Sequence, residues 1–178
     1  LGADGYLGWP TCMYFSKKGY QVIAIDNYYK KNLLLKENVT PLFNVPTLVQ
    51  RAKLWNKLTG LEIKVKIADL KNINTLNDVF TKKMKFNWCV NNSYRIPDSV
   101  IHFAEQPSAP YSIKSNETAN DTLLNNLIVT NNTIFAIKNY SPKSHLVKLG
   151  TMGEYGTPNI DIEEGWININ HKNRSEKF

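Results

Sequence analysis

Three glycines near the start of the chain, Gly2, Gly5 and Gly8, constrain the fold more than any other feature of the sequence. Their G-x-x-G-x-x-G spacing is typical of the turn that joins a strand to a helix in dinucleotide-binding domains. One glycine permits the sharp turn, the next lets the backbone approach a pyrophosphate, and the third lets the helix pack closely on the strand. The amides that open the helix then point at the phosphates. Since ordinary loops produce such spacings by chance, the pattern needs support from its context.

The rest of the chain alternates strand-like and helix-like segments. We expect strands at 20–26, 61–67, 99–103 and 145–149, and helices at 9–18, 47–58, 74–82 and 120–138. We expect irregular backbone at 27–46 and 83–96, a proline-broken loop at 105–112, and loop with a short strand at 157–178. This order predicts an α/β fold, namely a Rossmann-type doubly wound parallel sheet with right-handed crossovers.

We interpret residues 1–178 as one NAD-binding domain of a longer protein. The chain starts inside the glycine turn, so the first strand of the fold is expected to precede Leu1. The longer protein is also expected to continue after residue 178 into a further helix and a substrate domain. On its own, a chain of this extent is not expected to turn over substrate.

Acidic residues follow two of the expected strands. Asp26 ends the first strand and stands 18 residues after Gly8, near the distance at which a Rossmann unit places its ribose-binding carboxylate. An acid there accepts hydrogen bonds from the ribose hydroxyls and repels a 2′-phosphate, which favours NAD over NADP. The alternative is a surface acid at a strand end. Asp69 and Leu70 follow the next strand, at the sheet edge where ligands collect.

Composition excludes several classes of function. The net charge is +7, but the lysines are scattered without an aromatic-interleaved stripe, so we predict no nucleic-acid partner. No apolar run approaches the length of a membrane span. Cys12 and Cys89 have neither metal-ligand nor disulfide spacing, and we predict no metal site. His102 and His145 lie in strand-like runs, where a structural role is the favoured interpretation.

A catalytic residue is expected just beyond the last strand of the sheet. In short-chain dehydrogenases and reductases, a Ser or Thr at this place orients the reacting alcohol, and a Tyr-x-x-x-Lys pair supplies the general base. Thr151 is placed for the first role. Tyr14 and Lys18 match the pair formally, but they lie on the first helix beside the wrong end of the cofactor, so we regard the match as coincidence.

The 21-residue block from His145 to Gly165 resembles the UDP-sulfoquinovose synthase family, which makes the sulfolipid headgroup in plastids and photosynthetic bacteria. Within the extended short-chain dehydrogenases and reductases, this family belongs to the NAD-dependent epimerases and dehydratases. The resemblance runs along nearly the whole chain and includes residues 2–9, 16–18, 25–27, 58–60, 97–100, 108–112, 125–126 and 135–138.

The resemblance implies a reaction of UDP-glucose with sulfite. In the family, bound NAD+ oxidises C4 of the sugar, and the ketone acidifies the C5 proton. Loss of the 6-hydroxyl gives an enone, sulfite adds at C6, and NADH reduces C4 again. The resemblance also implies a homodimer through long helices, and a plastid stromal location in a eukaryote or a cytoplasmic one otherwise.

The resemblance further implies roles for individual residues. The cofactor would be bordered by Gly2, Gly5 and Tyr6 at the pyrophosphate, Asp26 and Asn27 at the ribose, Lys30 and Lys31 near that end, Asp69 and Leu70 at the adenine, and Asn125 near the active site. Gln106 and Thr151 would bind the sugar. Glu154 would approach the sugar as a catalytic group, or else serve as a structural carboxylate in a turn.

The sequence departs from the family pattern in two places within the chain. Pro107 stands where the family usually has arginine, which removes a cation and a donor fork near cofactor and sugar. Val129 replaces a glycine of the family, which could crowd helix packing. Two alternatives therefore stay open: another NAD-dependent sugar-nucleotide epimerase or dehydratase, and an inactive NAD-binding module.

Overall fold

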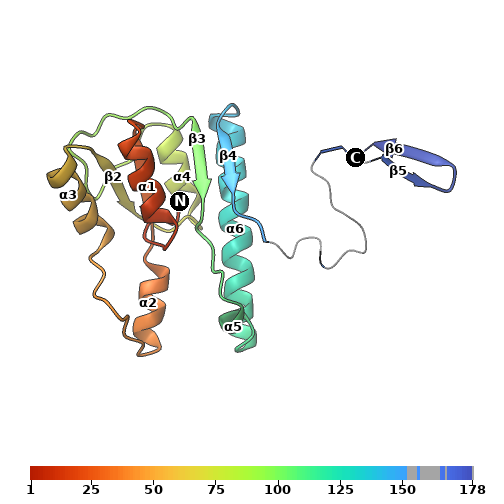
Figure 1. The fold of residues 1–178 in the computed structure, drawn as a ribbon, viewed down its shortest axis with the longest axis horizontal. Helices are drawn as coiled ribbons and strands as arrows, with labels where there is room; N and C mark the ends of the chain where they lie inside the picture. Colours follow the sequence, from red (N-terminus) through yellow and green to blue (C-terminus); the bar gives the residue numbers. More distant parts are fainter. Residues whose placement is uncertain (152–155, 157–164, 167, 178) are drawn as a thin grey trace. The chain divides into compact units, whose positions relative to one another are not determined.

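The structure is a computed structural model that describes residues 1–151, 156, 165–166 and 168–177 (Figure 1). The chain divides into two compact units, Leu1–Lys148 and Leu149–Phe178.

The described elements follow the predicted alternation closely. The helices are α1 (Gly8–Lys17), α2 (Tyr29–Lys36), α3 (Leu48–Thr59), α4 (Ile73–Phe80), α5 (Ala109–Ser112) and α6 (Asn116–Tyr140). The strands are β1 (Val22–Asp26), β2 (Ile63–Ile67), β3 (Ser99–His102), β4 (His145–Lys148), β5 (Asn168–His171) and β6 (Arg174–Lys177).

The helix ends have local causes in the sequence. Thr47 caps α3 in a capping box with Gln50, as expected for the start of this helix. Gly60 ends the same helix in the left-handed conformation, with φ of 72°. Ser115 and Thr118 form a second capping box at the start of α6. Each cap satisfies amides that the first turn of a helix leaves without partners.

The strands of the first unit form two parallel pairs, β1 with β2 and β3 with β4. Leu1 joins the pairs, because its amino group donates to the Ile101 carbonyl at 2.8 Å and its carbonyl accepts from the Phe103 amide at 3.0 Å. On the other side, the Gly2 amide donates to the Ile25 carbonyl at 2.9 Å. The backbone of Leu1 and Gly2 thus holds the strand position between β1 and β3. The predicted parallel sheet is therefore built in the order β2, β1, Leu1, β3, β4.

Two hydrophobic clusters cover opposite faces of this sheet. On β1, Ala24 belongs to the cluster with α3 residues such as Leu48 and Ala52, whereas Ile25 belongs to the cluster with α4 and α6. Successive residues of a strand point to opposite faces, so helices pack on both sides. Val129 of α6, which stands where the family has a glycine, is buried within the second cluster. The arrangement is doubly wound, as the sequence predicts.

Four local expectations differ from the structure. Within the loop expected at 105–112, Ala109–Ser112 form the short helix α5. Residues 29–36, expected to be irregular, form α2, although none of its side chains is buried. Residues 83–96 were expected to be irregular throughout, but Trp88 within them forms an antiparallel bridge to Val65 at the edge of β2. Leu58 shares a helix face with Leu48 and Ala52, which predicts burial, but its side chain is 72% exposed.

The second unit contains an antiparallel hairpin of β5 and β6, with Ile169 opposite Glu176. Lys172 and Asn173 form its turn with positive φ values of 45° and 64°, the conformation that two-residue hairpin turns require. Within the described residues of the whole chain, no helix is both long and apolar enough to cross a membrane.

Candidate functional site

The glycine turn leaves no room for side chains at two of its three glycines. Gly2 has φ of +75°, and a Cβ there would lie 2.7 Å from the carbonyl carbon and oxygen of Phe103. A Cβ on Gly8 would lie 2.1 Å from the Gly2 carbonyl oxygen, and one on Gly5 would lie 3.3 Å from the same atom. The first glycine thus permits the turn against β3, and the third lets α1 pack against the strand backbone.

The start of α1 presents free amide donors. Leu7, the residue before the helix, provides no side-chain cap. Across residues 1–151, the amides of Tyr6 and Leu7 donate to no other group of the protein. The Tyr6 side chain is 88% exposed. Free amides at the positive end of a helix dipole fit a phosphate group, so this turn suits the pyrophosphate of a dinucleotide.

Asp26 at the end of β1 is attached directly to the glycine turn. Its carboxylate accepts hydrogen bonds from the Asp4 amide at 2.9 Å and the Tyr28 amide at 2.7 Å. Burial raises the pKa of Asp26, although these two hydrogen bonds act to lower it. Asn27 beside it accepts from the Tyr29 amide at 2.9 Å. The predicted ribose-binding acid and the predicted pyrophosphate turn therefore form one connected structure.

A cation pair lies against the same turn. Lys31 contacts the Asp4 carboxylate at 3.2 Å, and Arg51 of α3 forms an ion pair with the same group. Lys30, the other lysine predicted near the cofactor, is exposed. Sequence reasoning missed Asp4 and Arg51, because a separation of 47 positions in the sequence leaves no local pattern.

The predicted adenine contacts occupy two different environments. Asp69 follows β2 and is partly exposed, accepting a hydrogen bond from the Lys71 amide at 2.9 Å. Leu70 is only 3% exposed and packs in the core with α4 and α6. Its side chain is committed to that core, so any contact with a base at this position would come from its backbone.

The loop after β3 is fastened to α6 through a residue for which the sequence suggested no role. Asn126 accepts from the Gln106 amide at 2.8 Å and donates to the Gln106 carbonyl at 3.1 Å. Gln106 in turn accepts from the Ser108 amide at 3.1 Å. Asn125 donates to Asn126 at 3.1 Å and is 8% exposed. The structure therefore brings Gln106 and Asn125 together, with Asn126 holding both.

Two tyrosines tie α2 to the segment after β3. The hydroxyls of Tyr29 and Tyr111 lie 3.1 Å apart, and both donate to the carboxylate of Asp121 on α6. Burial and these hydrogen bonds raise the pKa of Tyr29, so its hydroxyl stays protonated and remains a donor. This contact links the segment that follows β1 to the segment that follows β3.

His102 is a structural residue of β3, as the sequence favours, whereas His145 is exposed on β4. The His102 ring is fully buried and accepts from the Ala104 amide at 3.1 Å. Beyond it, Glu105 forms an ion pair with Lys148 at 2.7 Å.

The remaining predicted site residues lie in the second unit or beyond the described residues. Thr151 is exposed in the second unit, which is described separately from the glycine turn. Glu154 lies outside the described residues. Their predicted catalytic roles stay predictions. In the part of the chain that the structure describes, no group of His, Cys, Asp and Glu is arranged to hold a metal ion.

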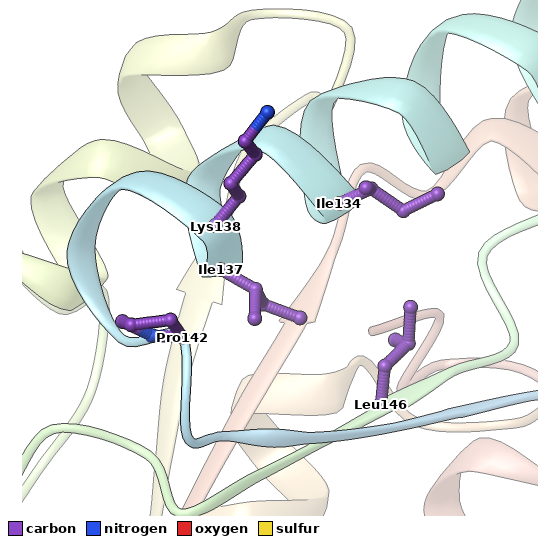
Figure 2. Close-up of a pocket in the computed structure, with 5 residues that line it drawn as sticks. All are labelled: Ile134, Ile137, Lys138, Pro142 and Leu146. Atoms are coloured by element: carbon purple, nitrogen blue, oxygen red, sulfur yellow. The ribbon is translucent and has the colours of Figure 1, made fainter.

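An apolar hollow of about 290 Å³ lies elsewhere in the first unit, between the end of α6 and β4 (Figure 2). It is lined by Ile134, Ile137, Lys138, Pro142 and Leu146. None of the predicted site residues contributes to it. A hollow with a single charged side chain lacks the polar groups that orient a nucleotide, so the candidate site is the glycine turn instead.

Comparisons with known proteins show which family this chain belongs with. The family model described as "NAD dependent epimerase/dehydratase family" matches residues 1–174. The chloroplastic UDP-sulfoquinovose synthase of Spinacia oleracea is 42% identical over 179 residues, which cover 99% of this chain and 34% of that protein. The UDP-sulfoquinovose synthase of Sulfolobus acidocaldarius is 36% identical over 164 residues, covering 92% of this chain and 39% of that protein.

A solved structure shares the fold. The UDP-glucose 4-epimerase of Bifidobacterium longum, crystallised with NAD+ and UDP, superposes with a TM-score of 0.62 at 23% identity. The match covers 89% of this chain and 38% of the epimerase. The chain thus spans about a third of the length of its curated relatives.

Proposed function

The chain belongs to the NAD dependent epimerase/dehydratase family, and on that basis we propose that it carries the NAD-binding part of a UDP-sulfoquinovose synthase. The whole protein would convert UDP-glucose and sulfite to UDP-sulfoquinovose. The name of the enzyme rests on the 42% and 36% identity to two such synthases.

One observation supports the cofactor assignment above all. The glycine turn has no space for a Cβ at Gly2 or Gly8, and its amides lie beside the carboxylate of Asp26. A turn built this tightly, with donors open at a helix start, has the chemistry that a dinucleotide pyrophosphate needs. The residues present therefore fit NAD.

The roles proposed for the chain's own residues follow from their positions. When bound, NAD+ supplies a hydride acceptor for C4 of the sugar and later returns the hydride. The free amides of Tyr6 and Leu7 would bind the pyrophosphate, and Asp26 would accept hydrogen bonds from the ribose hydroxyls. Gln106, held by Asn126, would present its side chain to the sugar end. Thr151 would orient the sugar hydroxyls, with Glu154 close to the sugar.

The exposed face of α6 supports a homodimer. Leu123 and Leu127 are each 68% exposed, although they stand on a long helix of the first unit. Large apolar side chains on one helix face are typical of a protein contact. A second copy of the chain is the occupant that the family resemblance implies. By the same resemblance, we propose a plastid location in a eukaryote.

Product analysis tests the proposed function. The full-length protein, incubated with UDP-glucose, sulfite and NAD+, should form a sulfonated sugar nucleotide detectable by mass spectrometry. In that form, Thr151→Ala should reduce turnover with little loss of NAD+ binding. Equal loss of turnover and of binding would make Thr151 a structural residue.

One observation keeps an inactive NAD-binding module as the second candidate. Pro107 is exposed next to Gln106, and it offers no cation and no amide donor to a ligand at this place. Binding of NAD+ without any sulfonated product from the full-length protein would favour this second candidate.

A further inference from the structure

Asp4 of the glycine turn engages two cations. Its side chain is only 9% exposed and lies between Lys31 of α2 and Arg51 of α3. Lys31 contacts both carboxylate oxygens at 3.2 Å. Arg51 donates to one of those oxygens and also lies 3.5 Å from the Asp4 carbonyl. One carboxylate therefore binds two positive charges that come from separate helices.

This group of charges adjoins the proposed ribose site. The Asp4 amide donates to the Asp26 carboxylate at 2.9 Å, so the two acids are neighbours in space. Asp26 is the residue proposed to accept hydrogen bonds from the adenosine ribose. The two cations therefore contact a residue that is itself hydrogen-bonded to the proposed ribose-binding acid.

Arg51 has the chemistry of a phosphate-binding residue. Its guanidinium stacks on the ring of Trp9, with 4.9 Å between its central carbon and the ring centroid. Its Nε is buried and has no hydrogen-bond partner among the described residues. A planar, fixed arginine beside the ribose is the group that accommodates the 2′-phosphate of NADP in many Rossmann domains. Here its charge is already directed to Asp4.

We propose that Asp4 is a specificity-determining residue, which withholds Lys31 and Arg51 from a 2′-phosphate and thereby excludes NADP+. The inference rests on the proposed NAD-binding function and adds a second source of selectivity to the repulsion from Asp26. A purely structural role for Asp4 would leave the choice between the two cofactors unchanged when its charge is removed.

The test compares NAD+ and NADP+ dissociation constants in the wild-type chain and in Asp4→Asn, which keeps the shape of the side chain and removes its charge. Affinity for NADP+ relative to NAD+ should rise about tenfold or more, because each freed cation can form a charge-assisted hydrogen bond with the phosphate. Adding Arg51→Met to Asp4→Asn should cancel most of this gain. Partial unfolding lowers affinity for both cofactors, so it cannot produce the gain.

A matched control removes an acid elsewhere on the surface. Glu37 pairs with Lys114 at 2.6 Å, and both side chains are about half exposed. Glu37→Gln changes the net charge by the same amount as Asp4→Asn, so it should leave the ratio of the two affinities unchanged. A similar gain in Glu37→Gln would attribute the effect to net charge and overturn the proposal.

The remaining outcomes of the test distinguish failure of this inference from failure of the proposed function. Wild-type preference for NAD+ that persists unchanged in Asp4→Asn overturns this inference and leaves the proposed function standing. A wild-type chain that binds neither cofactor contradicts both. If Asp4→Asn does not fold, Lys31→Ala gives the answer: NADP+ affinity should stay within about twofold of wild type. A tenfold loss there would mean that Lys31 already serves a 2′-phosphate, contrary to the proposal.

Discussion

The buried ring of His102 should make the first unit lose stability as the pH falls. Its Nδ1 accepts a hydrogen bond from the Ala104 amide at 3.1 Å, so a proton on that atom would face another N–H group. Its Nε2 lies 3.3 Å from the Thr130 hydroxyl. Burial lowers the pKa of His102 from 6.5 to about 4, although the nearby Glu105 acts to raise it.

The size of the effect follows from this shift. Between the two pKa values the unfolded chain binds a proton that the folded chain refuses, so stability is fully present above pH 6.5 and declines as the pH falls toward 4. The unprotonated His102 contributes about 3 kcal/mol in total to the free energy of unfolding, and about 2 kcal/mol of this contribution should be lost between pH 7 and pH 5. The raised pKa of Asp26 acts in the opposite direction, so a variant must isolate the histidine.

Urea unfolding, followed by circular dichroism from pH 7 to pH 5, measures the effect. His102→Asn should be less stable than the wild type at pH 7, since the smaller side chain leaves a cavity, but it should lose about 2 kcal/mol less over this pH range. His145→Asn removes an exposed imidazole from β4 and serves as the control. A His102→Asn profile parallel to that of the wild type would refute the argument.

Four further changes have definite expected results. Gly8→Ala should cost about 1–3 kcal/mol in urea unfolding and weaken NAD+ binding in a titration, because the new Cβ meets backbone at 2.1 Å. Gly19→Ala should cost about 1 kcal/mol through its φ of +87° alone and leave NAD+ affinity intact; equal effects of both on NAD+ would contradict the account. Burial acts to raise the pKa of Glu62, but hydrogen bonds lower it overall. The ionised side chain therefore stabilises the fold above pH 4.5, and this stabilisation is lost below that pH. Acid unfolding of Glu62→Gln should show no such loss. Asn126→Ala should raise the KM of a full-length enzyme for UDP-glucose more than it lowers thermal stability, since it releases the backbone of Gln106; a change in stability alone would make Asn126 structural.

The sheet could be predicted because its signals are local. The β1 run Val22–Asp26 and the β2 run Ile63–Ile67 are rich in β-branched residues, and each is bounded by turn residues. Helix α2 was missed for a physical reason. Its sequence has no apolar periodicity, which agrees with the absence of buried side chains in the helix. Its contacts are with residues distant in the sequence, such as that of Tyr29 with Asp121.

The candidate site likewise has a part that the sequence predicts and a part that it does not. The spacing of Gly2, Gly8 and Asp26 is fixed by one strand–turn–helix–strand unit, so sequence distance alone indicated their association. Arg51 reaches the site from α3, and Asn126 acts on a loop 20 residues away in sequence. Such contacts depend on how the helices pack, which no local pattern records.

The central claim is that NAD+ binds at the glycine turn, and amide NMR of the labelled chain tests it most directly. Titration with NAD+ should shift the amide resonances of Tyr6 and Leu7, whose N–H groups donate to no other group within residues 1–151, together with that of Asp4. The amide of Ile137, at the apolar hollow, should not move. An unchanged spectrum, or shifts gathered around Ile137, would contradict the account.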